Sequence, residues 1–280
     1  MKSIKSVVLF YNSKRKKSGA FASGVEKALK ARGAAVTKIC VNEPAKDFRK
    51  ADAAVTVGGD GTVLYAARRV IKYGMPVLGI NAGGMGFLSG LERSDFRRNL
   101  EDFLGGRLKK VRRQLLSVSV LRRSGRAFGP YPALNDCVIR SAESRAFKLK
   151  ASFGGKLLSE YFGDGLIVST PTGSTAYNLA ASGPIVLPEL GVFLLSPICP
   201  HTLTHRPIVL PSGGELRIAV EGKPGLDHRV TMSLDGQENF ELEPADEIVL
   251  RRHPRDLEML VPENFSYFDV LRKKLSWGER

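Results

Sequence analysis

The chain has 280 residues, 43% of them hydrophobic and 25% charged, and its 43 lysine and arginine residues against 28 aspartate and glutamate residues give a formal net charge of +15. This composition excludes a disordered or fibrous protein, and the apolar runs are far shorter than the roughly 18 residues that a membrane-spanning helix needs. The charge favours anionic partners such as nucleotides or polyphosphate, although a solvated basic surface explains it equally well. Without interleaved aromatic residues, it indicates no specific nucleic-acid partner.

Strand and helix patterns alternate over the first hundred residues. Apolar strands are predicted at residues 7–11, 36–41, 53–57 and 76–80. The segments between and after them have helical periodicity and end at glycines. Alternating strands and helices with short loops predict a doubly wound parallel sheet, that is, a Rossmann-like α/β domain over residues 1–112.

The pattern changes near Val111. Short strand-like segments are separated there by glycine-containing turns, which are typical of antiparallel hairpins. These segments are residues 115–121, 133–139, 147–153, 156–161, 216–220, 229–234 and 247–251. One helix is predicted inside this region, at residues 174–181, and a basic helix is predicted within the tail, residues 265–277. Residues 113–261 are therefore predicted to be all-β apart from one inserted helix.

Cysteine and histidine usage indicates the compartment. Cys40, Cys137 and Cys199 are odd in number and far apart, so they form neither a disulfide framework nor a metal-binding pair. The histidines also lack the spacing of zinc ligands. No apolar stretch near the N-terminus is long enough for a signal peptide. We expect a cytoplasmic protein that binds neither zinc nor a membrane.

The first motif with chemical meaning is Gly58-Gly59-Asp60-Gly61-Thr62, which follows a predicted buried strand and precedes a helix. Glycines at such a junction let the backbone approach a phosphate, and Thr62 adds a hydroxyl donor. An acid in the centre would repel a phosphate, so Asp60 needs another role. It can accept the proton of an attacking hydroxyl or help to hold a metal that bridges phosphates. A tight turn in which Asp60 only caps the helix is the alternative.

The second motif runs from Asp164 to Tyr177 and reads DGLIVSTPTGSTAY. Five hydroxyl residues stand within the seven positions from Ser169 to Thr175, whereas a capping turn usually needs one or two. Such hydroxyls can bind sugar hydroxyls, an adenine edge or a pyrophosphate.

The third feature is Asn135-Asp136, two polar residues inside the predicted apolar strand 133–139. Polar residues in a buried strand are either paired or functional. A neutral amide beside a carboxylate suits a ribose diol or an adenine edge. An internal hydrogen-bonded pair or a β-bulge is the alternative.

Together these motifs resemble those of the NAD kinase family. The matching segments follow the family's order through most of the chain: Gly58 to Thr62, Gly79 to Leu88, Leu134 to Asp136, Asp164 to Tyr177, Ser182 to Ile185, Pro200 to Leu203, Arg206-Pro207 and Asp235 to Gln237. GGDGT alone is shared with lipid kinases and, loosely, with phosphofructokinases. The long serine- and threonine-rich segment is much more specific.

The resemblance implies an α/β N-terminal domain, a β-sandwich-like second domain, and a C-terminal tail, residues 262–280, that packs back on the first. It also implies phosphoryl transfer from ATP or polyphosphate to the 2′-hydroxyl of the adenosine ribose of NAD, which gives NADP. A divalent metal, typically Mg²⁺, would accompany the donor. Members commonly form dimers or tetramers in which a neighbouring subunit completes the site, so we expect a homo-oligomer.

The family's motifs also carry residue roles over to this chain. Asp60 would be the general base, Gly61 would line the same site, and the donor phosphates would face Gly58, Gly59 and Thr62. The residues expected to bind the dinucleotide are Phe87, Asn135, Asp136, Asp164, Thr175, Ala176, Tyr177, Asn178 and Gln237.

The chain departs from the family pattern at several positions. The glycine-rich loop Ala82 to Met85 predicts a more mobile lid than the bulkier loop of many bacterial members. Asp136 stands where many members have glutamate, so its carboxylate reaches one methylene less far. Phe162 stands where some members have arginine, which removes a charge contact to the substrate at that position.

Two other functions remain open from the sequence. Another GGDGT kinase would act on a lipid or a sugar, and it predicts an apolar membrane-facing surface or a sugar-phosphate clamp. A non-catalytic nucleotide- or nucleic-acid-binding protein would use the charge of +15 and make no product.

Overall fold

The computed structural model describes residues 3–14, 16–82, 86–143, 145–221 and 229–276. The chain forms two compact units, one of Met1–Arg112 with Leu257–Arg280 and one of Arg113–Asp256. The predicted lid falls largely on residues 83–85, which lie outside the described residues, as does Trp277 at the end of the predicted tail helix. No helix in the described part of the chain has the length and apolar character needed to cross a bilayer.

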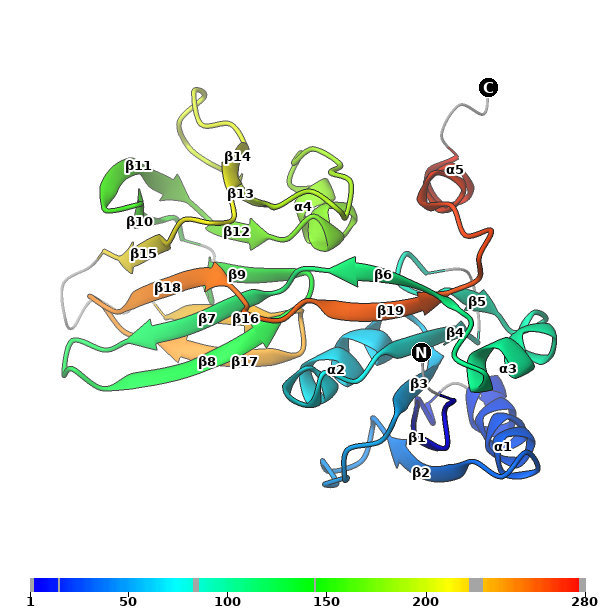
Figure 1. Cartoon of the computed structure of the whole chain (residues 1–280). Coiled ribbons are helices and arrows are strands. Elements are labelled where there is room, and N and C mark those ends of the chain that lie inside the picture. Colours follow the sequence, from blue (N-terminus) through cyan, green and yellow to red (C-terminus); the bar gives the residue numbers. More distant parts are fainter. Residues whose placement is uncertain (1–2, 15, 83–85, 144, 222–228, 277–280) are drawn as a thin grey trace. The chain divides into compact units, whose positions relative to one another are not determined.

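The first unit contains, within the described residues, a seven-stranded sheet (Figure 1). Its strands are β1 (Ser6–Tyr11), β2 (Ala35–Cys40), β3 (Ala53–Gly58), β4 (Val77–Asn81), β5 (Leu91–Glu92), β6 (Lys109–Arg113) and β19 (Leu257–Val261). The order is β2-β1-β3-β4-β19-β6, with β5 paired to β4. The pairs β1–β2, β1–β3, β3–β4, β4–β5 and β4–β19 are parallel. The sequence predicts the parallel strands β1 to β4, whereas β19 comes from the region 113–261 that was assigned to the second domain.

Helices cover both faces of this sheet. Side chains of α1 (Lys16–Lys30) and α3 (Phe96–Leu104) share one apolar cluster with Val7 and Leu9 of β1. Successive strand residues point to opposite faces, and the ring of Phe10 accordingly lies 6.1 Å from that of Tyr65 on α2 (Asp60–Val70). Because β1 is buried on both faces, it is a continuous apolar run. The prediction of a doubly wound, Rossmann-like sheet is therefore confirmed.

The C-terminal segment contributes to the first unit. Leu260 of β19 belongs to the same apolar cluster as Val7 and Leu9. The helix α5 (Tyr267–Leu275) follows, and its Lys273 Nζ lies 2.6 Å from Glu92 Oε1 at the end of β5.

The described part of the second unit contains two six-stranded sheets. One has the order β11-β10-β15-β18-β7-β8, from β7 (Leu116–Leu121), β8 (Ala127–Ala133), β10 (Phe147–Phe153), β11 (Lys156–Gly163), β15 (Leu216–Val220) and β18 (Glu247–Arg252). The other has the order β14-β13-β12-β9-β16-β17, from β9 (Asp136–Ser141), β12 (Gly165–Ser169), β13 (Val192–Ile198), β14 (Ile208–Pro211), β16 (Val230–Leu234) and β17 (Glu238–Leu242). Their strand pairs are antiparallel.

The two sheets of the second unit share one core. Val118 and Ile248 of the first sheet lie in the same buried cluster as Ile139 and Phe193 of the second. Two sheets with their inner faces in one apolar layer form a β-sandwich, so the predicted fold of this region is confirmed.

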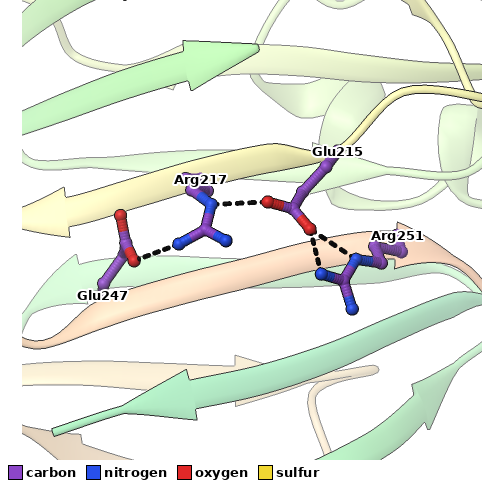
Figure 2. Close-up of polar contacts among 4 residues, drawn as sticks. All are labelled: Glu215, Arg217, Glu247 and Arg251. Atoms are coloured by element: carbon purple, nitrogen blue, oxygen red, sulfur yellow. Dashed lines mark hydrogen bonds and ion pairs between the residues drawn. The ribbon is translucent and has the colours of Figure 1, made fainter. Parts of the chain in front are cut away.

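Charged side chains lie on the solvent side of the first of these sheets. Arg217 binds both Glu215 and Glu247, and Arg251 also binds Glu215 (Figure 2). Burial alone would raise the pKa of Glu215, but hydrogen bonds from the two arginines more than offset it and lower the pKa. Pairs this exposed stabilise the fold little, and their main effect is to keep this face of the sheet solvated.

Two predicted elements differ from the structure. The predicted strand 133–139 is broken between β8 and β9, because Leu134 and Asn135 donate their backbone N–H groups to a side chain instead of a neighbouring strand. The predicted helix 174–181 is a 3₁₀ turn, η2 (Thr172–Thr175), followed by the single turn α4 (Tyr177–Ala180).

Candidate active site

The strand order of the first unit places the glycine-rich turn at a favourable position for a ligand. From β1 the chain leads to β2 on one side, whereas β3 leads to β4 on the other. In open α/β sheets, ligands bind outside the carboxyl ends of the strands where this change of direction occurs. Gly58 is the last residue of β3, so the segment Gly58 to Thr62 begins at this edge of the sheet.

The turn from β3 into α2 requires glycine. A Cβ on Gly58 would lie 2.1 Å from Thr62 Oγ1, which is a steric clash, so any residue larger than glycine would force Thr62 to move. Gly59 is the N-cap of α2, and Gly61 is exposed in its first turn. Thr62 is buried, and its hydroxyl has no hydrogen-bond partner among the described groups. Because Gly58, Gly59 and Gly61 have no side chains, a phosphate can come close to the backbone at the start of α2.

Asp60 does not cap α2. Its Oδ2 accepts the backbone N–H of Phe87 at 2.9 Å, and its Oδ1 accepts that of Leu88 at 3.1 Å. A Cβ on Gly86 would lie 1.9 Å from Oδ1, so only glycine fits there. The half-buried carboxylate is thus fixed in orientation, and these two bonds use about half of the four hydrogen bonds that a carboxylate can accept.

The segment that contains Phe87 also packs closely against two strands of the sheet. A Cβ on Gly79 of β4 would lie 3.0 Å from the carbonyl oxygen of Leu88, and one on Gly90 would lie 2.7 Å from that of Leu260. The backbone beside Phe87 therefore rests directly on β4 and β19, while the Phe87 side chain is half-buried.

In the second unit, Asp235 organises the Asn135–Asp136 segment. Its carboxylate accepts the backbone N–H groups of Leu134, Asn135 and Asp136 at 3.0, 2.7 and 3.2 Å. Asp235 is buried, with a left-handed φ of 53° in the turn between β16 and β17. Asp235 is not among the site residues predicted from the sequence, although it begins the matched segment Asp235 to Gln237.

Asp136 titrates near neutral pH. Its side chain is 5% exposed. Burial raises the pKa of Asp136 to about 7, and the negative charge of Asp235 adds to the effect. Asp136 can therefore either accept a hydrogen bond from a ligand hydroxyl or, when protonated, donate one.

The hydroxyl-rich segment mostly satisfies the backbone around it. Ser169 donates to the carbonyl oxygen of Asn135, and Thr170 donates to that of Leu134 at 2.6 Å. Ser174 bonds to the backbone of Val186, and Thr175 donates to the carbonyl oxygen of Thr172. Most of these hydroxyls thus shape the turn. The buried Thr172 hydroxyl has no partner among the described groups.

Asn178 is part of the interior. It is fully buried, its amide nitrogen donates to the carbonyl oxygens of Ser174 and Pro184, and its Oδ1 accepts the Ser196 hydroxyl at 2.7 Å. These bonds hold the backbone beneath Ala176 and Tyr177.

A cleft of about 460 Å³ opens in the second unit over β9 and β16. Tyr177, 41% exposed, is among the residues that line this cleft, and a tyrosine ring can stack on a heterocycle. The cleft is lined by Asn135, Asp136, Val138, Arg140, Ala176, Tyr177, Ser233, Asp235, Gly236 and Asn239.

The remaining predicted residues lie outside this lining. Asp164 is exposed directly before β12, and its backbone N–H donates to the carbonyl oxygen of Ile198. Thr175 is half-buried in η2, and Gln237 is half-buried after the Asp235–Gly236 turn. The predicted residues therefore form two groups: Gly58 to Thr62 with Phe87 in the first unit, and the remainder in the second.

A doubly wound domain with an acid-bearing glycine turn, joined to a β-sandwich with a polar cleft, is typical of a kinase that acts on a nucleotide. Comparison with known proteins makes the class specific. Residues 7–108 match the ATP-NAD kinase N-terminal domain, and residues 134–261 match the ATP-NAD kinase C-terminal domain. The chain belongs to the NAD kinase family.

Individual relatives agree with this membership. The chain is 42% identical to the NAD kinase of Geobacter sulfurreducens over 82% of this chain and 80% of the relative. It is 44% identical to that of Syntrophobacter fumaroxidans over 81% and 80%. The fold is similar to that of yeast NADH kinase complexed with NADH (TM-score 0.89, 22% identity, 99% of this chain and 89% of that one). It is also similar to that of an Archaeoglobus fulgidus NAD kinase in complex with ATP (TM-score 0.81, 24% identity, 98% and 100%).

Proposed function

We propose that this chain transfers the terminal phosphoryl group of ATP to the 2′-hydroxyl of the adenosine ribose of NAD, which produces NADP. The observation that carries the proposal is the oriented Asp60 carboxylate at the glycine turn of a member of the NAD kinase family. The ATP in the Archaeoglobus fulgidus relative supports this donor.

Asp60 acts as the general base. A sugar hydroxyl is a weak nucleophile, and a positioned base contributes typically about 10²–10⁴-fold to such a reaction. The bonds from Phe87 and Leu88 hold the carboxylate in one direction, so little reorganisation is needed when it accepts the proton.

The donor phosphates lie at the turn from Gly58 to Thr62. Backbone N–H groups at the start of α2 bind and orient them, and the helix dipole stabilises their charge. The unpartnered hydroxyl of Thr62 and the exposed Gly61 belong to the same site.

The groups available at this turn suit a Mg²⁺ ion that binds together with the phosphates of the donor. Among the described residues, no three histidine, cysteine or acidic side chains are grouped closely enough to form a protein metal site. Mg²⁺ is commonly bound through one or two carboxylates together with substrate phosphates. Because Asp60 is assigned as the base, the metal would be held mainly by the donor phosphates and water, and it would offset charge on the transferring phosphoryl group.

The dinucleotide binds to the cleft of the second unit. Asn135 and Asp136 recognise polar groups of a ribose or base, and Tyr177 stacks on a heterocycle. Ala176 also lines this cleft, and Asn178 positions the segment from within. Asp164, Thr175 and Gln237 lie outside the lining and would contact a part of the dinucleotide that extends beyond it.

The chain acts as a homo-oligomer in the cytoplasm. Large apolar side chains are exposed on the second unit, among them Leu203 (86%), Leu157 (59%) and Val209 (45%), and such surfaces commonly form subunit interfaces. All three cysteines are free, which suits a reducing compartment. Light scattering of the purified protein tests the assembly, and a monomeric mass would contradict it.

The decisive test is product formation. Purified protein is incubated with NAD, Mg²⁺ and a panel of donors, and NADP is measured with an NADP-specific dehydrogenase. We expect NADP with ATP. Polyphosphate is the second donor to test because the net charge of +15 favours polyanions. No product with any donor would refute the proposed function.

A further inference from the structure

The cleft of the second unit contains two carboxylates that do not suit an anionic ligand. Asp136 and Asp235 both line it. Asp235 is engaged by three backbone N–H groups, while Asp136 disfavours its charged form because it is buried. A phosphate placed beside them without a compensating cation would be repelled.

Arg140 is the cation among the residues that line this cleft. It lies on the same strand as Asp136, four positions further along β9, so both side chains are on the outer face of the sheet. At about 3.3 Å per residue, roughly 13 Å separate the two backbone positions. Arg140 therefore stands along the strand from the carboxylates, within the same cleft.

The surroundings leave the Arg140 guanidinium accessible. Its residue is exposed, and its side chain makes no hydrogen bond or ion pair with any described residue. In the sheet register, Arg140 lies between Gly165 of β12 and Thr231 of β16. Gly165 has no side chain, and a Cβ there would come within 3.0 Å of the Arg140 Cα. Nothing on that side crowds the arginine.

We propose that Arg140 binds a phosphate group of the dinucleotide and thereby determines the affinity of the cleft for a phosphate-bearing ligand. This inference rests on the proposed function, because it takes the cleft as the dinucleotide site. A guanidinium can bind a phosphate through two parallel N–H···O bonds, which fixes orientation as well as affinity. Two sources provide the same chemistry: the pyrophosphate of NAD and the 2′-phosphate of the product.

The test is calorimetric binding of NAD, NADP and adenosine to four proteins. These are the wild type, Arg140→Ala, Arg140→Lys and a matched control, Arg123→Ala. Arg123 is an exposed arginine of the same unit that does not line the cleft, so its removal changes the net charge equally. Adenosine serves as a probe without phosphate.

We expect Arg140→Ala to weaken NAD binding about tenfold, which corresponds to ~1.4 kcal/mol. Arg140→Lys should recover part of the loss, and Arg123→Ala should bind like the wild type. Adenosine should bind the wild type and Arg140→Ala equally well. Equal losses for NAD and NADP would assign the contact to the pyrophosphate, whereas a larger loss for NADP would assign it to the 2′-phosphate.

Three results would overturn the inference. One is unchanged NAD and NADP affinity in Arg140→Ala, and another is an equal loss in Arg123→Ala, which would mean that only the overall field matters. The third is an equal loss for adenosine, which would mean that Arg140 only supports packing. Wild-type NADP formation is measured alongside: no product would refute the proposed function, whereas normal product with unchanged Arg140→Ala binding would refute this inference alone.

Discussion

Asp60 has a structural role in addition to the general-base role that we propose for it. Its two oxygens accept the backbone N–H groups of Phe87 and Leu88. The carboxylate can come this close because Gly86 has no side chain. The same contacts that orient the Asp60 carboxylate therefore place Phe87. A change in either partner should disturb both.

Substituting Gly86 by alanine tests this coupling. The new Cβ would lie 1.9 Å from Asp60 Oδ1, so the carboxylate or the segment must shift. We expect a loss of about 1–3 kcal/mol in stability and a fall in kcat on the order of 10²-fold, because misplaced groups react slowly.

Gly24→Ala is the matched control for Gly86→Ala. Gly24 lies inside α1, and a Cβ there would meet nothing within 4 Å. This variant should gain about 0.5–1 kcal/mol and keep full activity. If Gly86→Ala behaved in the same way, the close approach of Asp60 would be wrong.

Asp136 predicts a pH dependence of stability. Its pKa rises from 3.8 to about 7 on folding, so the folded state binds this proton more tightly than the unfolded state does. Stability is therefore lost as pH increases from about 4 to 7, by up to roughly 4 kcal/mol. In Asp136→Asn this loss disappears. Urea unfolding at pH 5 and pH 8 should show that the wild type loses roughly 2–3 kcal/mol more than the variant between the two pH values, and parallel profiles would contradict the prediction.

At the scale of elements, the connection between β8 and β9 depends on a distant turn. Asp235 precedes β17, yet its carboxylate replaces the strand partners of residues 134–136. The turn between β16 and β17 and the Asn135–Asp136 segment thus form one structural piece.

Removing that carboxylate should affect stability and binding together. Asp235→Ala leaves three N–H groups without their acceptor, and each unsatisfied group costs about 1–3 kcal/mol. We expect a loss of at least ~3 kcal/mol in urea unfolding and a weaker affinity for NAD. Asp235→Asn, which keeps one acceptor oxygen, should lose less. Asp256→Ala, at an exposed ion pair with Arg252, serves as the control and should change little. A stable Asp235→Ala variant with normal affinity would contradict this role.

The sequence predicted those elements whose signal is local. β1, β3 and β4 are apolar runs buried on both faces, and the glycine turn after β3 is recognisable from its residues alone. β8 was not predicted, because Pro130 and Pro132 argue against a strand. The sheet tolerates both prolines because β8 is an edge strand. The break at Leu134–Asn135 could not be predicted, because the carboxylate that causes it comes from a residue about one hundred positions later.

The candidate site was also predictable only where its signal is local in the sequence. Asp60 was singled out by its unusual position among glycines, but its bonds to Phe87 and Leu88 depend on the tertiary fold. The hydroxyl-rich segment was recognised as unusual, whereas its main use, bonding to nearby backbone, became visible only with Leu134, Asn135 and Val186 in place.

At the scale of the whole molecule, each unit has its own core. The cluster of the sandwich draws its members from residues 116–250, all within Arg113–Asp256. The cluster of the α/β unit needs Leu260 of β19 together with residues of the first hundred or so. The core of the sandwich is therefore built from one continuous stretch of the chain, whereas the core of the α/β unit needs segments from both ends of the chain.

This difference predicts the behaviour of fragments. A fragment of residues 113–256 should fold alone, with a cooperative thermal transition and a β-type circular dichroism spectrum. A fragment of residues 1–112 lacks β19 and should unfold more readily than the same segment joined to residues 257–280 by a short linker. An unfolded 113–256 fragment would show that its core is insufficient.

The proposed mechanism depends on Asp60, which would accept the proton of the ribose hydroxyl while the phosphoryl group is transferred. The most direct test compares the wild type with Asp60→Asn in single-turnover formation of NADP, with NAD affinity measured on the same samples. We expect the wild type to form NADP, and we expect the variant to react roughly 10²–10⁴-fold more slowly with nearly unchanged NAD affinity. Normal turnover by the folded variant would contradict it.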